Sequence, residues 1–388
     1  MSLSLDSYGL SAGYGFLSDF ELDQVILPAD FAPVEAAANE LSGLITADSV
    51  RRVLDALPQP DIAAFLADAT ETQVRAAMVR YSFLVQAYVW SGDGPPLSLP
   101  ASIAVPIAAI GERLDQAPLL PYSSYVLDNW ARIDRAGPIA LDNIRMVQNF
   151  LGGQDENWFV LVHVAIEAEA GRALALACEL VAAADAGDEP KVATLLTEMD
   201  SVWTRINGHF DRMPERCDPY IYFQRVRPYI HGWKNNPAMP DGLIYEGVER
   251  FGGQPQAFRG QTGSQSSIVP AMDALFGVSH ENDPLREFLI ELHQYRPVAH
   301  RRFIEDLGAA SRLREFAVAS GHAELKTAFN ACVEQVARFR TRHLEYAAAY
   351  INKQAGGATG NDSDVGTGGT PFMKYLKKHR DENRAQTI

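Results

Sequence analysis

Apolar residues recur three and four positions apart over most of the chain, which is the spacing that places them on one face of an α-helix. The alternation of apolar and polar residues that marks a half-buried strand is almost absent. The pattern therefore predicts an all-α protein. The segments with the clearest helical spacing are Asp61–Gly92 (with breaks), Asn157–Ala186, Lys191–Arg212, Asp283–Tyr295 and Leu325–Lys353.

The character of the helices changes near residue 150. Before it, short helical pieces are broken by prolines, and after it the helices are longer and apolar all round, as buried helices are. We predict a small N-terminal helical domain over residues 1–150 and a large helical domain over residues 151–388. Near the end, the Gly-rich stretch 354–370 has the composition of a flexible linker. Because a helical segment follows it, a mobile lid over a site is the alternative.

Composition excludes several classes of partner. The chain has 388 residues with 34 Lys+Arg against 49 Asp+Glu, a formal net charge of −15. This charge argues against binding to nucleic acid and to anionic membrane surfaces. Three cysteines far apart argue against a thiolate zinc site or a disulfide framework. The first residues lack an export signal and no apolar run reaches the ~20 residues of a membrane span. We expect a soluble, cytoplasmic protein.

His343 lies in line with apolar residues on its predicted helix, so we expect it to be buried. Arg338, Arg340 and Arg342 interleave with that face. A buried imidazole beside several arginines suits an axial ligand of haem iron, with arginine available for the propionates. A core histidine satisfied by a neighbouring carbonyl is the alternative. The face consists of Phe329, Cys332, Val336, Phe339, His343 and Tyr346.

His163 and Glu167 lie one helical turn apart, so Glu167 can hydrogen-bond the imidazole. The pair could supply two of three ligands of a non-haem iron site. It could equally be a buried pair within the core. From spacing alone both interpretations stay open.

The segment Phe223–Trp233 combines Arg225, Arg227 and His231 with several aromatic residues. An arginine among aromatic rings can be a cation–π packing group. It can also be the fork that binds a substrate carboxylate in an apolar pocket.

A string of motifs extends along the chain: Pro118–Trp130, Trp158–Glu169, Gly232–Val248, Phe258–Val278, Tyr295–Leu307, Arg340–Ile351 and Gly366–Lys378. In their order and spacing they resemble the indoleamine 2,3-dioxygenase family over nearly the whole chain. The resemblance implies an all-helical, two-domain protein with haem b as cofactor and O₂ as co-substrate, in which the small N-terminal domain caps the distal side of the haem site. It also implies that both oxygen atoms enter the indole C2–C3 bond of L-tryptophan, giving N-formylkynurenine, and that an external reductant keeps the haem ferrous.

The resemblance also assigns roles residue by residue. His343 matches the proximal haem ligand, Arg227 the arginine that pairs with the substrate carboxylate, and Thr367 the threonine near the substrate ammonium group. Asp273 and Arg340 match a charged pair that helps to hold the ligand helix. The positions matched to the substrate pocket and its neighbouring loop are Tyr122, Phe159, Tyr222, Phe223, His231, Gly260, Gln261, Thr262 and Gly263.

Three positions depart from the best-known members of the family. His163 replaces a distal serine, Tyr222 a phenylalanine, and His231 a small hydroxyl residue. A distal histidine can hydrogen-bond O₂ or a substrate N–H, or bind the iron directly. These departures make a substituted tryptophan or another indole an alternative substrate. On the resemblance, dioxygenation of L-tryptophan or a close relative is the leading hypothesis. The alternatives are a haem-dependent indole-modifying enzyme of secondary metabolism and a non-catalytic, bis-histidine haem-binding or sensor protein.

Overall fold

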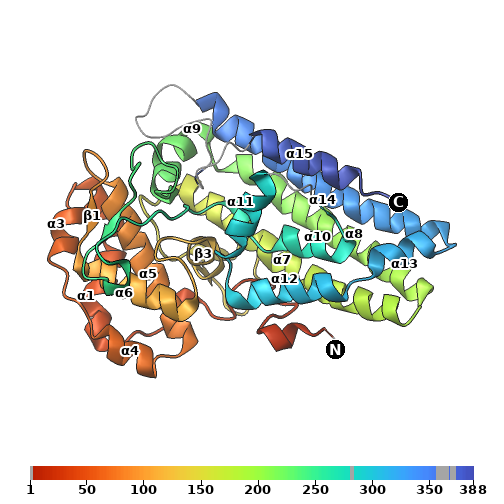
Figure 1. Cartoon of the computed structure of the whole chain (residues 1–388), viewed down its shortest axis with the longest axis horizontal. Coiled ribbons are helices and arrows are strands. Elements are labelled where there is room, and N and C mark those ends of the chain that lie inside the picture. The colour runs from red at the N-terminus through yellow and green to blue at the C-terminus, as the bar shows by residue number, and fades with distance from the viewer. Residues whose placement is uncertain (1–2, 280–283, 355–366, 368–372) are drawn as a thin grey trace.

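The computed structural model describes residues 3–279, 284–354, 367 and 373–388. These residues form an almost entirely helical molecule (Figure 1), which confirms the all-α prediction. The strands among them are very short: β1 (Ser98–Leu99) pairs in parallel with β4 (Ile244–Tyr245), and β2 (Trp130–Arg132) pairs antiparallel with β3 (Ile144–Met146). No helix in this part of the chain combines the length and apolar character that crossing a bilayer requires.

Short helices from the first part of the chain gather at one end of the molecule (Figure 1). The longest, α5, begins with a capping box in which Gln73 N donates to Thr70 Oγ1 (3.3 Å) and Thr70 N donates to Gln73 Oε1 (3.1 Å). Nearly all of its side chains are buried, so it is the central helix of this group. The group comprises α1 (Ala32–Asn39), α2 (Leu41–Thr46), α3 (Val50–Asp55), α4 (Ile62–Asp68), α5 (Glu71–Trp90) and α6 (Ala101–Leu114).

Long helices form the rest of the molecule (Figure 1). A short turn joins α7 to α8, so the two pack as antiparallel neighbours, and α14 packs on α8 and α15. The predicted helices are confirmed, with ends shifted by a few residues. The long helices are α7 (Gln154–Asp185), α8 (Glu189–Asp211) and α14 (Ala323–Tyr350). The shorter ones are α9 (Pro219–Ile221), α10 (Ile268–Phe276), α11 (Pro284–His293), α12 (Val298–Ala310), α13 (Leu313–Ala319) and α15 (Met373–Arg384).

The N-terminal segment packs directly on the middle of α7. A Cβ atom added to Gly171 would lie 2.5 Å from the carbonyl oxygen of Ala12, and one added to Gly15 would lie 2.5 Å from that of Glu167. Only glycine allows the two backbones to approach this closely. One buried apolar cluster runs through both parts of the chain, from Leu5 to Tyr350. The domain boundary near residue 150 stays a prediction.

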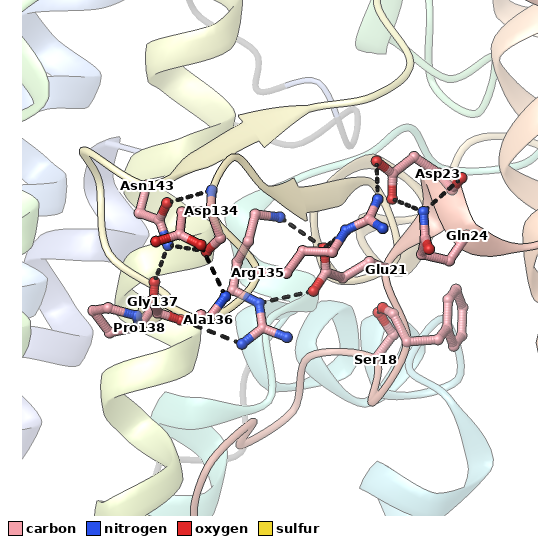
Figure 2. A network of polar contacts seen from close by, with 12 residues as sticks. Ser18, Glu21, Asp23, Gln24, Asp134, Arg135, Ala136, Gly137, Pro138 and Asn143 are labelled. Carbon is pink, nitrogen blue, oxygen red and sulfur yellow. Dashed lines mark hydrogen bonds and ion pairs between the residues drawn. The ribbon is translucent and has the colours of Figure 1, made fainter.

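Ion pairs fasten the N-terminal segment to the β2–β3 hairpin (Figure 2). The buried carboxylate of Glu21 accepts hydrogen bonds from the backbone N (2.9 Å) and Nε (2.7 Å) of Arg132. Asp23 accepts from Arg135 (3.0 Å) and Arg145 (2.6 Å). Since β3 leads into α7 within a few residues, this network helps to set where α7 begins.

Candidate active site

Two cavities border the same faces of α7 and α14. Their volumes are about 480 Å³ and about 130 Å³, and the larger one falls within the usual range for a cofactor or ligand site. We treat them as two parts of one site because they share wall residues from four segments. The shared residues are His163, Phe210, Gly263, Ser264 and His343.

His343 faces these cavities from α14. On its helical face Phe329, Cys332 and Val336 are buried in the core, whereas His343 itself is half-buried because it borders the open space. Neither ring nitrogen has a hydrogen-bond partner among the described residues, which contradicts the alternative of a core histidine satisfied by a carbonyl. Burial, with His163 and Arg340 nearby, lowers the pKa of His343 to about 4. The imidazole is therefore neutral at pH 7, with a lone pair available to a metal.

His163 borders the same cavities from α7. Its Nδ1 lies 2.7 Å from the carbonyl oxygen of Phe159. A carbonyl can only accept, so Nδ1 carries the proton and Nε2 carries a lone pair. Burial lowers the pKa of His163, which keeps it in this neutral form. The spacing allowed Glu167 to bond the imidazole, but the carbonyl of Phe159 one turn earlier occupies Nδ1 and Glu167 binds other residues.

Glu167 is a fully buried carboxyl group. Its Oε1 accepts hydrogen bonds from the hydroxyls of Tyr122 (2.9 Å) and Ser266 (2.8 Å). Burial raises the pKa of Glu167 to about 7. No group of three metal-ligating side chains occurs in the described part of the chain, so the structure provides no support for the non-haem iron alternative.

Aromatic side chains form much of the wall of the smaller cavity. The rings of Phe159 and Tyr222 lie 4.7 Å apart, and Tyr222 meets Tyr350 edge-on at 5.7 Å. Tyr222 opens a π-helical turn (Tyr222–Val226), whose wider turn follows directly on α9. The structure thus brings the predicted residues Phe159 and Tyr222 together at one wall. Tyr122 borders the larger cavity instead.

The predicted loop 260–263 also contributes to the lining of the smaller cavity. Gln261, Thr262 and Gly263 border it, as does Thr367, whose hydroxyl donates to the carbonyl of Gln261 (2.6 Å). Gly260, the first residue of the loop, does not border the cavity, and a Cβ atom added to it would collide with the backbone N of Gly232. The lid hypothesis concerns the stretch 354–370, which lies outside the described residues apart from its first residue and Thr367.

Arg227, Phe223 and His231 border neither cavity. Arg227 is fully buried, with its guanidinium carbon 5.4 Å from the centre of the Phe223 ring. The Nδ1 of His231 bonds the carbonyl of Arg227 (2.9 Å), and the carbonyl of His231 accepts from Gln86 and Trp90 on α5. Burial and the charge of Arg227 lower the pKa of His231 to about 3. His231 therefore anchors the arginine segment to α5 and borders neither cavity. Sequence reasoning did not anticipate this position.

The predicted charged pair is present behind His343. Arg340 Nη1 and Nη2 each donate to one carboxylate oxygen of Asp273, at 3.1 Å and 2.6 Å. This two-pronged geometry ties α14 to α10 one turn before His343. Both residues border the larger cavity.

Several residues of the site were missed from the sequence. Gln265 accepts from the backbone N of Tyr122 (3.0 Å) and donates to the carbonyl of Gly260 (3.1 Å), so it links Tyr122 to the loop 260–263. Ser266 binds Glu167, and Arg296 borders the larger cavity. Glutamine, serine and arginine are common surface residues, so the sequence carries no signal for these contacts beyond their place in the quoted motifs.

The fold and the cavities define an all-helical protein in which two histidine-bearing helices, α7 and α14, border the same candidate ligand site. The indoleamine 2,3-dioxygenase family model matches residues 4–386. The chain is 33% identical to indoleamine 2,3-dioxygenase 2 of Homo sapiens over 98% of the chain and 94% of that protein. It is 30% identical to indoleamine 2,3-dioxygenase 1 of Rattus norvegicus (98% and 95%), and 31% to an indoleamine 2,3-dioxygenase of Penicillium citrinum (97% and 87%). The chain belongs to the indoleamine 2,3-dioxygenase family and is a dioxygenase; the resemblance is confirmed.

Proposed function

We propose that the protein is a haem-dependent dioxygenase that cleaves the indole C2–C3 bond of L-tryptophan, or of a close indole derivative, to give N-formylkynurenine. One observation carries the cofactor assignment. His343 is neutral, has no hydrogen-bond partner among the described residues and borders a cavity of about 480 Å³. In a member of this family, that combination supports a proximal haem ligand.

The residues around the larger cavity fit haem b. His343 would hold the iron, and arginines at the cavity wall would face the propionates. The Asp273–Arg340 pair would keep the ligand helix in place. When bound, haem supplies a redox-active iron that activates O₂, provided that an external donor keeps it ferrous.

The protein's own part is to bind and orient the substrate. We assign the substrate carboxylate to Arg227 on its motif and its complete burial, with Thr367 near the ammonium group. The rings of Phe159 and Tyr222 would hold the indole plane and exclude water. The Nε2 lone pair of His163 can accept the indole N–H, whereas it cannot donate to O₂ in this tautomer.

The N-terminal helices, on this proposal, form the cap on the distal side of the site, and the protein works in the cytoplasm. Glu167 would keep the phenol of Tyr122 in one orientation at the wall of the larger cavity. No general base among these residues is needed if oxygen adds to the ring before the indole proton leaves.

Absorption spectroscopy tests the proposal. Purified protein is recorded in the ferric and ascorbate-reduced forms, and L-tryptophan and O₂ are then added. We expect a Soret band that shifts with tryptophan, followed by growth of the N-formylkynurenine band. If no Soret band forms even after reconstitution with haem, the cofactor assignment is wrong.

A second candidate rests on the position of His163. Two neutral imidazoles, on α7 and α14, border the same two cavities, so both could bind one iron. A low-spin spectrum that tryptophan does not change would favour this bis-histidine state. Turnover of an indole to another product would favour the biosynthetic alternative.

A further inference from the structure

Arg296 is a buried cation at the wall of the larger cavity. It lies between α11 and α12, is only 2% exposed, and borders the same cavity as His343. Its Nη2 donates to the carbonyl of Ser264 (2.8 Å) and its Nε to that of Ser266 (3.1 Å). Its Nη1 lies 3.2 Å from Nδ1 of His293. The guanidinium is thus held firmly against the loop that forms the cavity wall.

These contacts give three N–H groups of Arg296 a hydrogen-bond acceptor but do not neutralise the positive charge of the guanidinium. Two acceptors are carbonyl oxygens, and the third is an imidazole whose pKa burial lowers. Burial also lowers the pKa of Arg296 to about 10, which still leaves it charged at neutral pH. No carboxylate among the described residues pairs with it. Buried charges are normally paired, because desolvating a lone ion is costly.

Two other buried arginines show the normal arrangement. Arg340 pairs with Asp273, and Arg259, which is similarly buried, pairs with Glu291 at 2.7 Å. Arg296 differs from both because none of its three hydrogen bonds goes to a carboxylate. A guanidinium has five N–H groups, so these three bonds leave one N–H on each terminal nitrogen of Arg296 without a bond. A planar fork of this kind matches a carboxylate.

The composition of the wall points the same way. Three arginines border the larger cavity, Arg286, Arg296 and Arg340, against one acidic residue, Asp273, which already binds Arg340. The cavity is therefore suited to a ligand that carries negative charge at one edge.

We propose that Arg296 binds a carboxylate in the larger cavity and that a haem propionate supplies it. This inference rests on the proposed function, because it needs haem in the site. The other source of a carboxylate is the amino-acid substrate. The propionate is favoured because Arg296 borders only the larger cavity, whereas Thr367, Phe159 and Tyr222, which are matched to the substrate, border only the smaller one.

The test compares two porphyrins. Wild type, Arg296→Met and Arg296→Lys are each loaded with ferric protoporphyrin IX or with its dimethyl ester, in which both propionates are uncharged. The rate at which the porphyrin leaves for an excess of acceptor protein is followed at the Soret band. Arg301→Gln is the matched control: Arg301 is also an arginine with a mostly covered side chain (12% exposed), but it pairs with Asp115 and borders neither cavity.

We expect Arg296→Met to release ferric protoporphyrin IX about 10- to 100-fold faster, the contribution of a hydrogen bond to a charged group. Arg296→Lys should recover part of the loss, and the control should match wild type. The dimethyl ester should leave wild type and Arg296→Met at the same rate. Circular dichroism checks folding, and if the Met variant does not fold, the comparison is made with Arg296→Lys.

Two results would overturn the inference. If Arg296→Met accelerates loss of the ester as much as loss of the acid, Arg296 only holds the loop. If porphyrin release is unchanged but the tryptophan-induced Soret shift needs more tryptophan, the carboxylate is the substrate's. If wild type binds neither porphyrin, the proposed haem-dependent function itself is contradicted. This outcome is distinct from the two above, which contradict only the role of Arg296.

Discussion

The phenol of Tyr122 donates a 2.9 Å hydrogen bond to the buried carboxyl group of Glu167, one helical turn beyond His163. Ser266 donates a second bond to the same oxygen at 2.8 Å. Three segments thus meet at one carboxyl group: the turn after Pro121, the middle of α7 and the approach to α10. The other oxygen, Oε2, has no hydrogen-bond partner among the described residues. This arrangement favours a protonated Glu167, because an unpaired, buried anion would be costly.

Glu167→Gln should change how stability depends on pH. The pKa of Glu167 is raised from 4.5 to about 7 in the folded protein, so folding favours the protonated acid. This contribution is complete below pH 4.5 and is lost as the pH rises through 7. The full loss corresponds to roughly 3 kcal/mol. Glutamine keeps the acceptor for Tyr122 and never ionises, so the variant should escape the loss.

Urea unfolding of the haem-free protein at several pH values measures this effect. The variant should gain stability over wild type between about pH 4.5 and 7 and keep the gain above that range. Glu156→Gln is an informative comparison, since Glu156 is another buried acid with a pKa raised to about 7. A Glu167→Gln curve parallel to wild type at all pH values would show that folding does not raise the pKa of Glu167.

His343→Ala should abolish retention of haem, because the variant removes the neutral imidazole that borders the cavity. The vacated volume should accept free imidazole, and millimolar imidazole should restore part of the Soret band. His209→Ala provides a control, since His209 borders neither cavity. An unchanged haem spectrum in His343→Ala would remove the proximal assignment.

His163 should select substrates with a free indole N–H. Its Nδ1 proton is held by the carbonyl of Phe159, so Nε2 can act only as an acceptor. Wild type should prefer L-tryptophan over 1-methyl-L-tryptophan in kcat/KM by about 5- to 100-fold, the usual cost of leaving a buried acceptor unpaired. His163→Ala should narrow this ratio. If the ratio stays the same, His163 does not contact the indole nitrogen.

Arg227→Gln should weaken substrate binding and leave haem content unchanged. Losing a buried, charge-assisted pair costs about 2–5 kcal/mol, so KM should rise at least about tenfold. Tryptamine, which is tryptophan without the carboxylate, provides the matched test. Wild type and variant should turn over tryptamine equally poorly. A KM for tryptophan that does not move would show that Arg227 does not bind the substrate carboxylate.

Gly260→Ala should disturb the loop that borders the smaller cavity. A Cβ atom at this position would collide with the backbone N of Gly232 and lie 2.5 Å from the carbonyl oxygen of Ile230. Both neighbours are backbone atoms, which cannot turn away as a side chain can. We expect a melting temperature lowered by several degrees, corresponding to about 1–3 kcal/mol of overpacking. Gly263→Ala, with no atom within 4 Å of its added Cβ, should melt like wild type.

Much of the architecture followed from the sequence. Helix formation depends on apolar spacing within one segment, so α7, α8 and α14 could be predicted from local periodicity. The same periodicity placed His343 on the apolar face of its helix. The family could also be identified from the sequence, because its motifs occur in order along nearly the whole chain.

Only the tertiary structure decided which groups meet. Glu167 binds Tyr122 and Ser266, which lie 45 and 99 residues away along the chain, rather than His163 one turn earlier. His231 hydrogen-bonds the backbone carbonyl of Arg227, and Arg296 is a buried cation at the wall of the larger cavity. Periodicity along one helix states which face is apolar, but not what packs against it. Partners and burial depend on how distant segments pack, and the same residue types occur at many positions where no such contact forms.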